Sequence, residues 1–371
     1  MIQDDWWPLI RGGSVHVREL SLALAEECGH EVDIYTRSLK QKGVRYTETE
    51  TYLDGAVSVV RLGPCTEYWN GVGRVSSMVT PLPRLLRGEY DVIHGHTFLP
   101  AVPTWVGTSL TDAASVFTVH GTALTSGVGH DTTALADVKR RIERSFVLDF
   151  EYDHVISVNK EHLELLSDAH NAVSYVPNGV DINRFSVDRE TVEGRILFVG
   201  RLAPKKRVSD LIEAYSNVAA DLPESELVIV GTGSLQAELE RLAADSDAAE
   251  SIRFEGSVPD DAIPGYYASA ELFVLPSVWE GHPLTLLEAW VAGTPVVATD
   301  TEGITEFVDH GETGYLVPPE SPADLADTIQ YALENRSVAQ QWGANGRTLA
   351  SEEYSWTGAA RKTDELYRQI T

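Results

Sequence analysis

Short apolar runs and amphipathic segments alternate along most of this chain. Runs rich in branched and aromatic residues predict buried strands, and in the first half they span residues 31–36, 57–62, 90–94, 115–120, 154–158 and 173–176. A charged, turn-rich stretch follows, and the alternation then restarts, with strands expected at residues 195–199, 226–230, 252–254, 271–275, 295–298 and 314–317. Strands that alternate with helices are typical of parallel sheets covered on both faces. The pattern therefore predicts an α/β fold of two doubly wound domains that meet near residues 178–194.

The segments between these runs carry apolar residues at helical spacing. Amphipathic helices are expected at residues 15–27, 208–219, 235–244, 323–333 and 354–370. Because a chain of 371 residues exceeds the usual single core, two domains of ordinary size are expected. We assign residues 1–177 to an N-terminal domain and residues 178–353 to a C-terminal domain. The last helix, within residues 354–371, is expected to pack back on the N-terminal domain.

The N-terminal domain opens abnormally for a doubly wound fold. Such a domain should begin with an apolar strand that leads into a glycine loop, yet only Met1, Ile2 and Gln3 precede the segment 4–8. Either the first strand is vestigial or the start codon was chosen too late. The chain carries no low-complexity tract and no short repeat, which excludes solenoid architectures.

The charge balance is strongly acidic, with 56 acidic and 29 basic residues and a formal net charge of −27. Lysine is scarce, with seven lysines against 22 arginines. An acidic, lysine-poor surface suits a protein kept soluble in concentrated salt, so a halophilic origin is expected. The same acidity argues against nonspecific binding to nucleic acid.

Cysteine content and hydropathy bear on the cellular location. Cys28 and Cys65 are the only cysteines, too few for a disulfide framework, and they fit a reducing compartment. No apolar run approaches the roughly 18 residues of a membrane span. The N-terminus also lacks a basic region followed by an apolar stretch. We therefore expect a cytoplasmic protein.

Two carboxylates lie around a predicted loop-to-helix junction in the second domain. Glu280 follows the strand at 271–275 within a loop, and Glu288 lies on a helix that Pro283 is expected to open as its first residue. The unpaired amides and the positive dipole end of that helix favour an anion. Carboxylates accept hydrogen bonds from sugar hydroxyls, so a phosphorylated sugar would satisfy both features. The alternative interpretation is that Glu280 is an ordinary loop acid and Glu288 a solvated helix position. The apolar neighbours of Glu288 argue against this alternative.

A basic segment follows the first strand of the second domain. Arg201, Lys205, Lys206 and Arg207 come directly after Gly200, with no acidic residue among them. Phosphates bind outside the carboxyl ends of strands in open α/β sheets. An arginine can grip two phosphate oxygens, and a lysine supplies a compact charge. The alternative interpretation is a solvated basic loop.

Glycines and histidines at other strand ends are weaker candidates. Gly13, in a Gly-Gly pair before the helix at 15–27, would let a backbone approach an anion. Gly233, in a Gly-Thr-Gly loop after the strand at 226–230, could make room for a nucleobase or ribose, although this loop lacks the third glycine of a dinucleotide fingerprint. His120 ends the strand at 115–120 and could bind a sugar hydroxyl or move a proton.

The remaining polar features favour structural interpretations. His94 and His96 also end a strand, and we expect them to be structural. The D-x-D segment 245–247 falls in a polar connection and is not interpreted as a metal site. The basic cluster at 139–144 could touch anionic lipid or an acceptor phosphate, but a solvated helix face is the preferred interpretation.

Taken together, these residues resemble the retaining nucleotide-sugar glycosyltransferases of family 4. The matching elements are Gly12-Gly13, Val119-His120, Gly200-Arg201 with Lys206, and Glu280 through Glu288, which occur in the family order across essentially the whole chain. The resemblance implies the GT-B fold, in which two Rossmann-like domains face each other across a cleft. It also implies a sugar transferase of the EC 2.4 class.

The resemblance further implies a role for each matched residue. Arg201 and Lys206 would hold the donor pyrophosphate, with help from the amide of Gly13. Glu288 would accept hydrogen bonds from the ribose hydroxyls, and Glu280 would lie beside the transferred sugar. His120 would lie near the sugar and the attacking acceptor. The other residues of the sugar and phosphate cradle would be Gly200, Gly233, Gly281, Leu284, Thr285 and Leu286.

The family chemistry sets the expected partners. The donor would be a nucleotide-diphosphate sugar, which is a substrate rather than a cofactor, and no metal would be required because Arg201 and Lys206 supply positive charge. The acceptor would be a saccharide or a lipid-linked saccharide in cell-surface glycan assembly, which would bring the enzyme to the inner face of the membrane. Alternatives are a nucleotide-sugar epimerase of the same fold, a sugar-binding protein, and an inactive transferase-like partner subunit.

Overall fold

A computed structural model of the protein describes residues 1–8, 12–120 and 134–371, and the side chains within these ranges except those of 134–137, 139 and 140. The described residues form two compact units. The N-terminal unit contains the chain up to Gly179 together with the last segment, Trp356–Thr371, whereas the C-terminal unit spans Val180–Ser355. The boundary expected between residues 177 and 178 lies two residues before the observed one.

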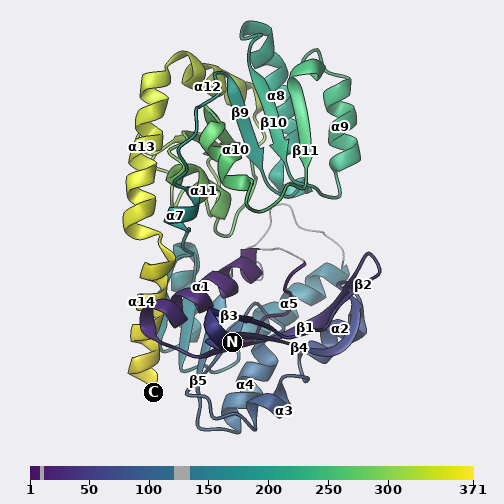
Figure 1. Ribbon diagram of the computed structural model, residues 1–371, viewed down its shortest axis with the longest axis vertical. Coiled ribbons are helices and arrows are strands. Elements are labelled where there is room, and N and C mark those ends of the chain that lie inside the picture. The colour runs from purple at the N-terminus through teal and green to yellow at the C-terminus, as the bar shows by residue number, and fades with distance from the viewer. Residues whose placement is uncertain (9–11, 121–133) are drawn as a thin grey trace. The chain divides into compact units, whose positions relative to one another are not determined.

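The C-terminal unit is built on a six-stranded parallel sheet with the order β11-β10-β9-β12-β13-β14 (Figure 1). From β9 the chain adds β10 and β11 toward one edge of the sheet, and from β12 it adds β13 and β14 toward the other edge. The loops that leave β9 and β12 therefore diverge at a topological switch point, where open α/β sheets bind ligands. The strands are β9 (Arg195–Val199), β10 (Glu226–Val230), β11 (Ile252–Gly256), β12 (Leu272–Leu275), β13 (Val296–Thr299) and β14 (Tyr315–Val317).

Helices cover both faces of this sheet, which explains why its central strands read as continuous apolar runs. Residues of β9, β10, β12 and β13 form one core with the helices. Trp290 is fully buried, and its indole N–H donates to the carbonyl of Thr313 at 2.9 Å. The helices are α7 (Ile182–Phe185), α8 (Val208–Asp221), α9 (Gln236–Ala244), α10 (Ile263–Ser269), α11 (Leu284–Val291), α12 (Pro322–Glu334) and α13 (Arg336–Glu353).

The N-terminal unit contains two four-stranded groups, in the orders β2-β1-β4-β3 and β5-β6-β7-β8. Met1–Gln3 joins them, because Ile2 forms parallel bridges to both Tyr35 and Gly95. Its N–H donates to the carbonyl of His94 at 2.9 Å. The expected opening strand is thus present as a three-residue segment in the middle of the sheet. The strands are β1 (Val32–Gln41), β2 (Val44–Tyr46), β3 (Glu50–Tyr52), β4 (Val57–Glu67), β5 (Val92–His96), β6 (Ala114–Val119), β7 (His154–Ser157) and β8 (Val173–Tyr175).

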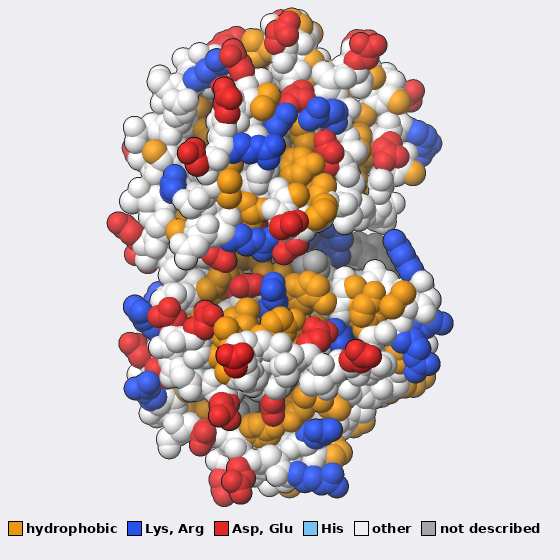
Figure 2. Space-filling model, viewed as in Figure 1, with side chains coloured by type: hydrophobic (Ala, Val, Ile, Leu, Met, Phe, Trp, Pro, Cys, Tyr) orange, Lys and Arg blue, Asp and Glu red, His pale blue; other side chains and the backbone are white. Residues whose placement is uncertain are grey.

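The C-terminal helix α14 (Trp356–Ile370) belongs to the N-terminal unit and packs against α1 (Gly12–Cys28) (Figure 1). The other helices of this unit are α2 (Gly71–Ser77), α3 (Leu82–Leu85), α4 (Ala101–Ser109), α5 (Ala134–Leu148) and α6 (Leu163–Ala169). Within the described ranges, no helix has the length and apolar character needed to cross a membrane. The prediction of two doubly wound α/β domains is confirmed. Figure 2 shows acidic side chains over the visible face, as the net charge of −27 requires.

Candidate functional site

The loops that leave β9 and β12 meet through a buried ion pair. The Lys206 ammonium nitrogen lies 2.5 Å from Oε1 of Glu280, and the Lys205 nitrogen lies 3.6 Å from Oε2. The Ser277 hydroxyl donates to Glu280 at 2.5 Å. The side chain of Glu280 is 6% exposed and that of Lys206 is 11% exposed. Two segments predicted to bind a donor are therefore in direct contact at the switch point.

The surroundings of Glu280 hold it ionised. Burial by itself raises the pKa of this carboxyl, but the charges of Lys206 and Lys205 and the hydrogen bonds from Lys206 and Ser277 outweigh burial, so the pKa lies below its ordinary value. The pKa of Lys205 is lowered, chiefly by burial. Its ammonium also lies 4.5 Å from the centre of the Trp279 ring, which gives a favourable cation–π contact.

Backbone contacts fix the loop that carries Glu280. The N–H of Val278 donates to the carbonyl of Lys205 at 3.0 Å, and the N–H of Glu280 donates to the carbonyl of Glu302 at 3.2 Å. Gly303 has a positive φ of +80°, and a Cβ at this position would lie 1.9 Å from the carbonyl oxygen of Glu280. Only glycine fits there, so Gly303 is part of what places the carboxylate.

The basic loop divides into two functions. Arg207 has a φ of +48° and lies immediately before α8, where its Nε lies 2.9 Å from Asp210. It therefore serves the helix start rather than a ligand. The loop also carries Arg201, which is exposed, and the two lysines that pair with Glu280. In a chain of net charge −27, a loop with this many cations favours an anion.

Glycines next to this loop allow two backbone segments to approach closely. A Cβ at Gly231 would lie 1.9 Å from the carbonyl oxygen of Gly200, and a Cβ at Gly233 would lie 2.1 Å from that of Leu202. The space that the sequence assigned to a nucleobase or ribose beside Gly233 is thus taken on one side by the backbone of the basic loop. This packing by itself requires both glycines.

The start of α11 presents polar groups beside the Glu280 loop. Pro283 has φ −78° and ψ 91° and precedes the helix, so the expectation that it is the first helical residue is wrong by one position. The hydroxyl oxygen of Thr285 is buried and has no hydrogen-bond partner among the described residues. Leu284 and Gly281 are half-buried, whereas Leu286 is fully buried. The N–H of Leu286 donates to the carbonyl of Pro283 at 3.0 Å, whereas the helix start as a whole favours an anion.

Glu288 lies on the same helix in an environment opposite to that of Glu280. Its Oε2 accepts a hydrogen bond from the Tyr267 hydroxyl at 2.7 Å. Burial raises the pKa of Glu288, and the bond from Tyr267 only partly offsets this. The sequence indicated Glu288 but not Tyr267, because no local pattern marks a buried tyrosine on α10 as its partner.

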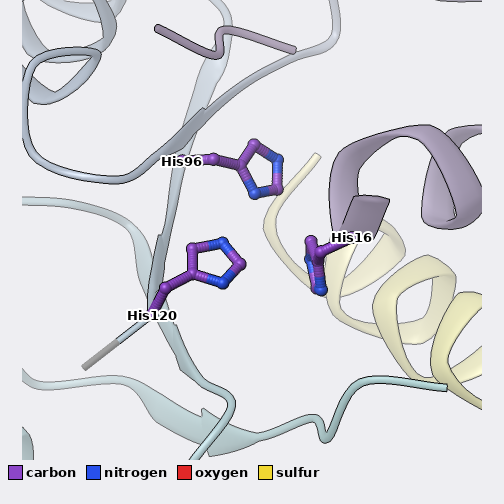
Figure 3. A group of neighbouring side chains, drawn as sticks. All are labelled: His16, His96 and His120. Carbon is purple, nitrogen blue, oxygen red and sulfur yellow. The ribbon is translucent and has the colours of Figure 1, made fainter. Parts of the chain in front are cut away.

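In the N-terminal unit, three histidines converge at the carboxyl ends of the strands (Figure 3). His96 ends β5, His120 follows β6, and His16 lies near the start of α1. The rings of His16 and His120 are 4.7 Å apart between centres, and those of His16 and His96 are 5.4 Å apart. The sequence indicated His120 alone. The position of His16, one turn after the Gly12-Gly13 pair, was the available signal.

Gly13 and His94, which were also interpreted from the sequence, lie a few positions from His16 and His96 along the chain. Gly13 lies in the first turn of α1, and a Cβ there would meet the Gln3 side chain at 3.3 Å. His94 fits its structural interpretation, since its ring nitrogens bond to Tyr367 at 2.6 Å and Thr118 at 2.7 Å. The ring of His96, also expected to be structural, is fully buried.

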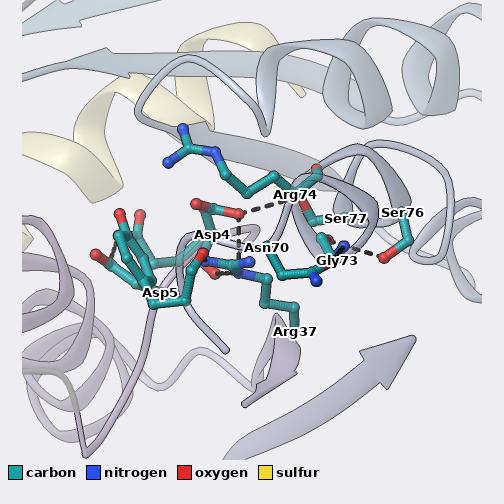
Figure 4. Close-up of polar contacts among 10 residues, drawn as sticks. Asp4, Asp5, Arg37, Asn70, Gly73, Arg74, Ser76 and Ser77 are labelled. Carbon is teal, nitrogen blue, oxygen red and sulfur yellow. Dashed lines mark hydrogen bonds and ion pairs between the residues drawn. The ribbon is translucent and has the colours of Figure 1, made fainter. Parts of the chain in front are cut away.

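A buried polar network holds Asp4, which follows the N-terminal strand (Figure 4). The Arg37 side chain is 1% exposed, and its Nε lies 3.1 Å from the carbonyl oxygen of Asp4 and 3.3 Å from its carboxylate. Arg37 also donates to the carbonyl of Tyr68 at 2.8 Å, and Ser77 donates to Asp4 at 3.1 Å. This network ties β1, α2 and Tyr68, which follows β4, to Asp4.

Comparisons with known proteins agree with these two units. The family model "Glycosyl transferases group 1" matches residues 180–349, and "Glycosyltransferase Family 4" matches residues 10–184. A D-inositol 3-phosphate glycosyltransferase of Corynebacterium jeikeium is 30% identical over 76% of this chain and 73% of its own.

Solved structures show the same arrangement of elements. Sucrose-phosphate synthase from Thermosynechococcus elongatus superposes with a TM-score of 0.80 at 25% identity, covering 97% of this chain and 94% of its own. Anabaena HepE in complex with UDP-glucose superposes with a TM-score of 0.75 at 18% identity, covering 100% of this chain and 98% of its own. The likeness therefore extends over both units.

Proposed function

Because the chain belongs to the GT-B glycosyltransferases that combine a family 4 and a group 1 domain, we propose that its donor is a nucleotide-diphosphate sugar and its acceptor a saccharide or lipid-linked saccharide. We propose further that transfer retains the anomeric configuration. The observation that carries the proposal is the pairing of Lys206 with Glu280 at the switch point of the C-terminal sheet. It joins a phosphate-binding charge to a carboxylate suited to a sugar.

The donor assignment is supported by the charge and the helix start beside that pair. Arg201 and Lys206 would bind the pyrophosphate, and the first turn of α11, with the Thr285 hydroxyl, would bind phosphate or sugar oxygens. Glu288 would accept hydrogen bonds from the ribose hydroxyls. HepE, which shares the fold, is seen with UDP-glucose, and a uridine diphosphate sugar is accordingly the first donor to test.

Donor binding would redistribute the ion pair. Without donor, Glu280 neutralises Lys206 at 2.5 Å. A pyrophosphate carries more charge than one carboxylate and would draw Lys206 toward itself. Glu280, which stays ionised because its pKa is lowered, would then accept hydrogen bonds from the sugar and stabilise positive charge that develops on the anomeric carbon.

The chemical step would follow from positioning and charge. The acceptor hydroxyl would attack the anomeric carbon from the face that the phosphate leaves, and the departing phosphate oxygen would take its proton. Arg201 and Lys206 would stabilise the leaving diphosphate, which is the role that a metal ion plays in other transferases. His120 would bind the sugar or the acceptor from the N-terminal unit, and the Gly13 amide would support the phosphate.

The cellular setting is part of the same proposal. We place the enzyme in the cytoplasm, at the inner membrane face where the acceptor is lipid-linked. Arg141 and Arg144 are exposed on α5, which fits the solvated helix face preferred from the sequence. The acidic, lysine-poor composition supports a halophilic origin.

A transfer assay with labelled donors tests the proposal. The protein is incubated with labelled nucleotide sugars and a panel of saccharide and lipid-linked acceptors, and the anomeric configuration of any product is read by NMR. Lys206→Ala and Glu280→Ala should each abolish transfer, whereas Lys362→Ala, which removes an exposed lysine of α14, should not. An isomerised donor without glycosylated product would instead identify an epimerase. Unchanged rates in both site variants would refute the site assignment.

A further inference from the structure

The histidine cluster of the N-terminal unit contains buried nitrogens that no described group satisfies. His16 and His96 are 1% and 0% exposed. Nε2 of His16 and both ring nitrogens of His96 have no hydrogen-bond partner within the described ranges. A buried polar atom without a partner costs free energy, so native proteins rarely keep several together without a ligand. A group that accepts nitrogen lone pairs would satisfy Nε2 of His16 and one ring nitrogen of His96.

One contact outside the cluster fixes the orientation of His16. Its Nδ1 lies 2.6 Å from Oδ1 of Asn178. An amide oxygen only accepts, so Nδ1 carries the proton and Nε2 presents its lone pair to the cluster. Metal-binding histidines commonly show this arrangement, in which the second ring nitrogen donates to an oxygen that holds the ring in place.

The geometry of the cluster fits a metal ion. One nitrogen from each of His16, His96 and His120 lies within 4.8 Å of the others. Tetrahedral zinc with Zn–N bonds of about 2.0–2.1 Å requires nitrogens about 3.4 Å apart, which small side-chain rotations would achieve.

We propose that His16, His96 and His120 bind a Zn²⁺ ion, with the fourth position left to water or another ligand. Three imidazoles favour zinc over the hard cations Mg²⁺ and Ca²⁺, which prefer oxygen ligands. His120 is half-buried and lies on the accessible side of the cluster. Bound zinc would occupy His120 and inhibit sugar transfer, a consequence that rests on the proposed function.

Metal binding is measured on the full-length, chelator-treated protein without donor or acceptor. Zn²⁺ is titrated by calorimetry, and Co²⁺ is titrated by its visible absorption, which is intense for four-coordinate cobalt. We expect one ion per chain. His16→Gln and His96→Gln should each weaken binding at least tenfold, and Asn178→Ala should weaken it by about 10–100-fold through the lost second contact of His16. The matched control His310→Gln removes a histidine of the C-terminal unit and should bind as the parent does.

The outcomes separate the site from the transfer reaction. Absence of binding at one ion per chain, or binding that persists unchanged in both His16→Gln and His96→Gln, would overturn the zinc site. Circular dichroism checks the folding of each variant, and Asn178→Ala, which leaves all three ligands in place, decides the matter if a histidine variant misfolds. Zinc that binds without inhibiting transfer would keep the site and remove His120 from the transfer reaction.

Discussion

Replacing Lys206 by methionine tests the ion pair on which the functional proposal depends. At 2.5 Å, and with an effective dielectric constant of about 20, the attraction between Lys206 and Glu280 is about 7 kcal/mol before the cost of desolvation. Removing one partner of a buried pair typically costs about 3–5 kcal/mol. Lys205 remains 3.6 Å from Glu280 and moderates the loss, so we expect about 3 kcal/mol. Calorimetry should show the C-terminal unit melting about 6–12 °C lower.

The pH dependence distinguishes this charge effect from a packing effect. The pKa of Glu280 is lowered in the folded protein, so its ionised form adds stability that is present above the ordinary value of 4.5 and is lost as the pH falls through the folded pKa. The deficit of Lys206→Met should therefore be full at pH 7 and shrink in acid. The double variant Lys206→Met, Glu280→Gln should recover much of the stability, and exposed Lys362→Met serves as the control. An equal deficit at both pH values, or no recovery in the double variant, would refute the reasoning.

Three further predictions concern groups around the site and the N-terminal network. Glu288→Gln removes a carboxyl whose pKa is raised in the folded protein, so this carboxyl favours the fold at a pH below its ordinary pKa and opposes the fold at higher pH. The stability of the variant at pH 7 should therefore hold or rise, while its affinity for UDP, measured by thermal shift, should fall about 10–100-fold. Weaker folding with intact affinity would contradict both assignments. Gly303→Ala should lower the melting temperature and transfer rate together, because its Cβ would displace Glu280; unaltered values would show that the loop accommodates the methyl group. Arg37→Met should lower the free energy of unfolding, measured by chemical denaturation, by about 3–5 kcal/mol, because it leaves the Asp4 carboxylate buried without its partner. A second change, Asp4→Asn, should restore part of this loss. If the effects of the two changes simply add in the double variant, the coupling is disproved.

Strands that contain an apolar run were predictable, whereas two short, exposed strands of the N-terminal unit were not. The apolar runs at residues 195–199 and 226–230 coincide with β9 and β10, because parallel strands between helix layers need apolar residues on both sides. The short strands β2 and β3 were missed. Their residues are half-buried or exposed and show no apolar run that could mark them.

The candidate site was predicted in part. Glycine and charge patterns after predicted strands indicated the basic loop and the glutamates, because parallel strands place their carboxyl ends at one edge of the sheet. The sequence did not indicate that Arg207 is engaged by Asp210, or that the Gly233 position is filled by the backbone at Leu202. Such details depend on contacts between loops rather than on the order of residues within one loop.

The amino-acid sequence by itself determined the two α/β domains, their strands and the residue types at the strand ends, because burial leaves a periodic pattern within each element. Only the tertiary structure decided which distant residues meet. Lys206 and Glu280 are 74 positions apart, and Tyr267 and Glu288 come from different helices. His16, His96 and His120 come from one helix and two strand ends. The physical reason is that such contacts follow from the order of strands in a sheet and the packing of helices on it, which no local periodicity records.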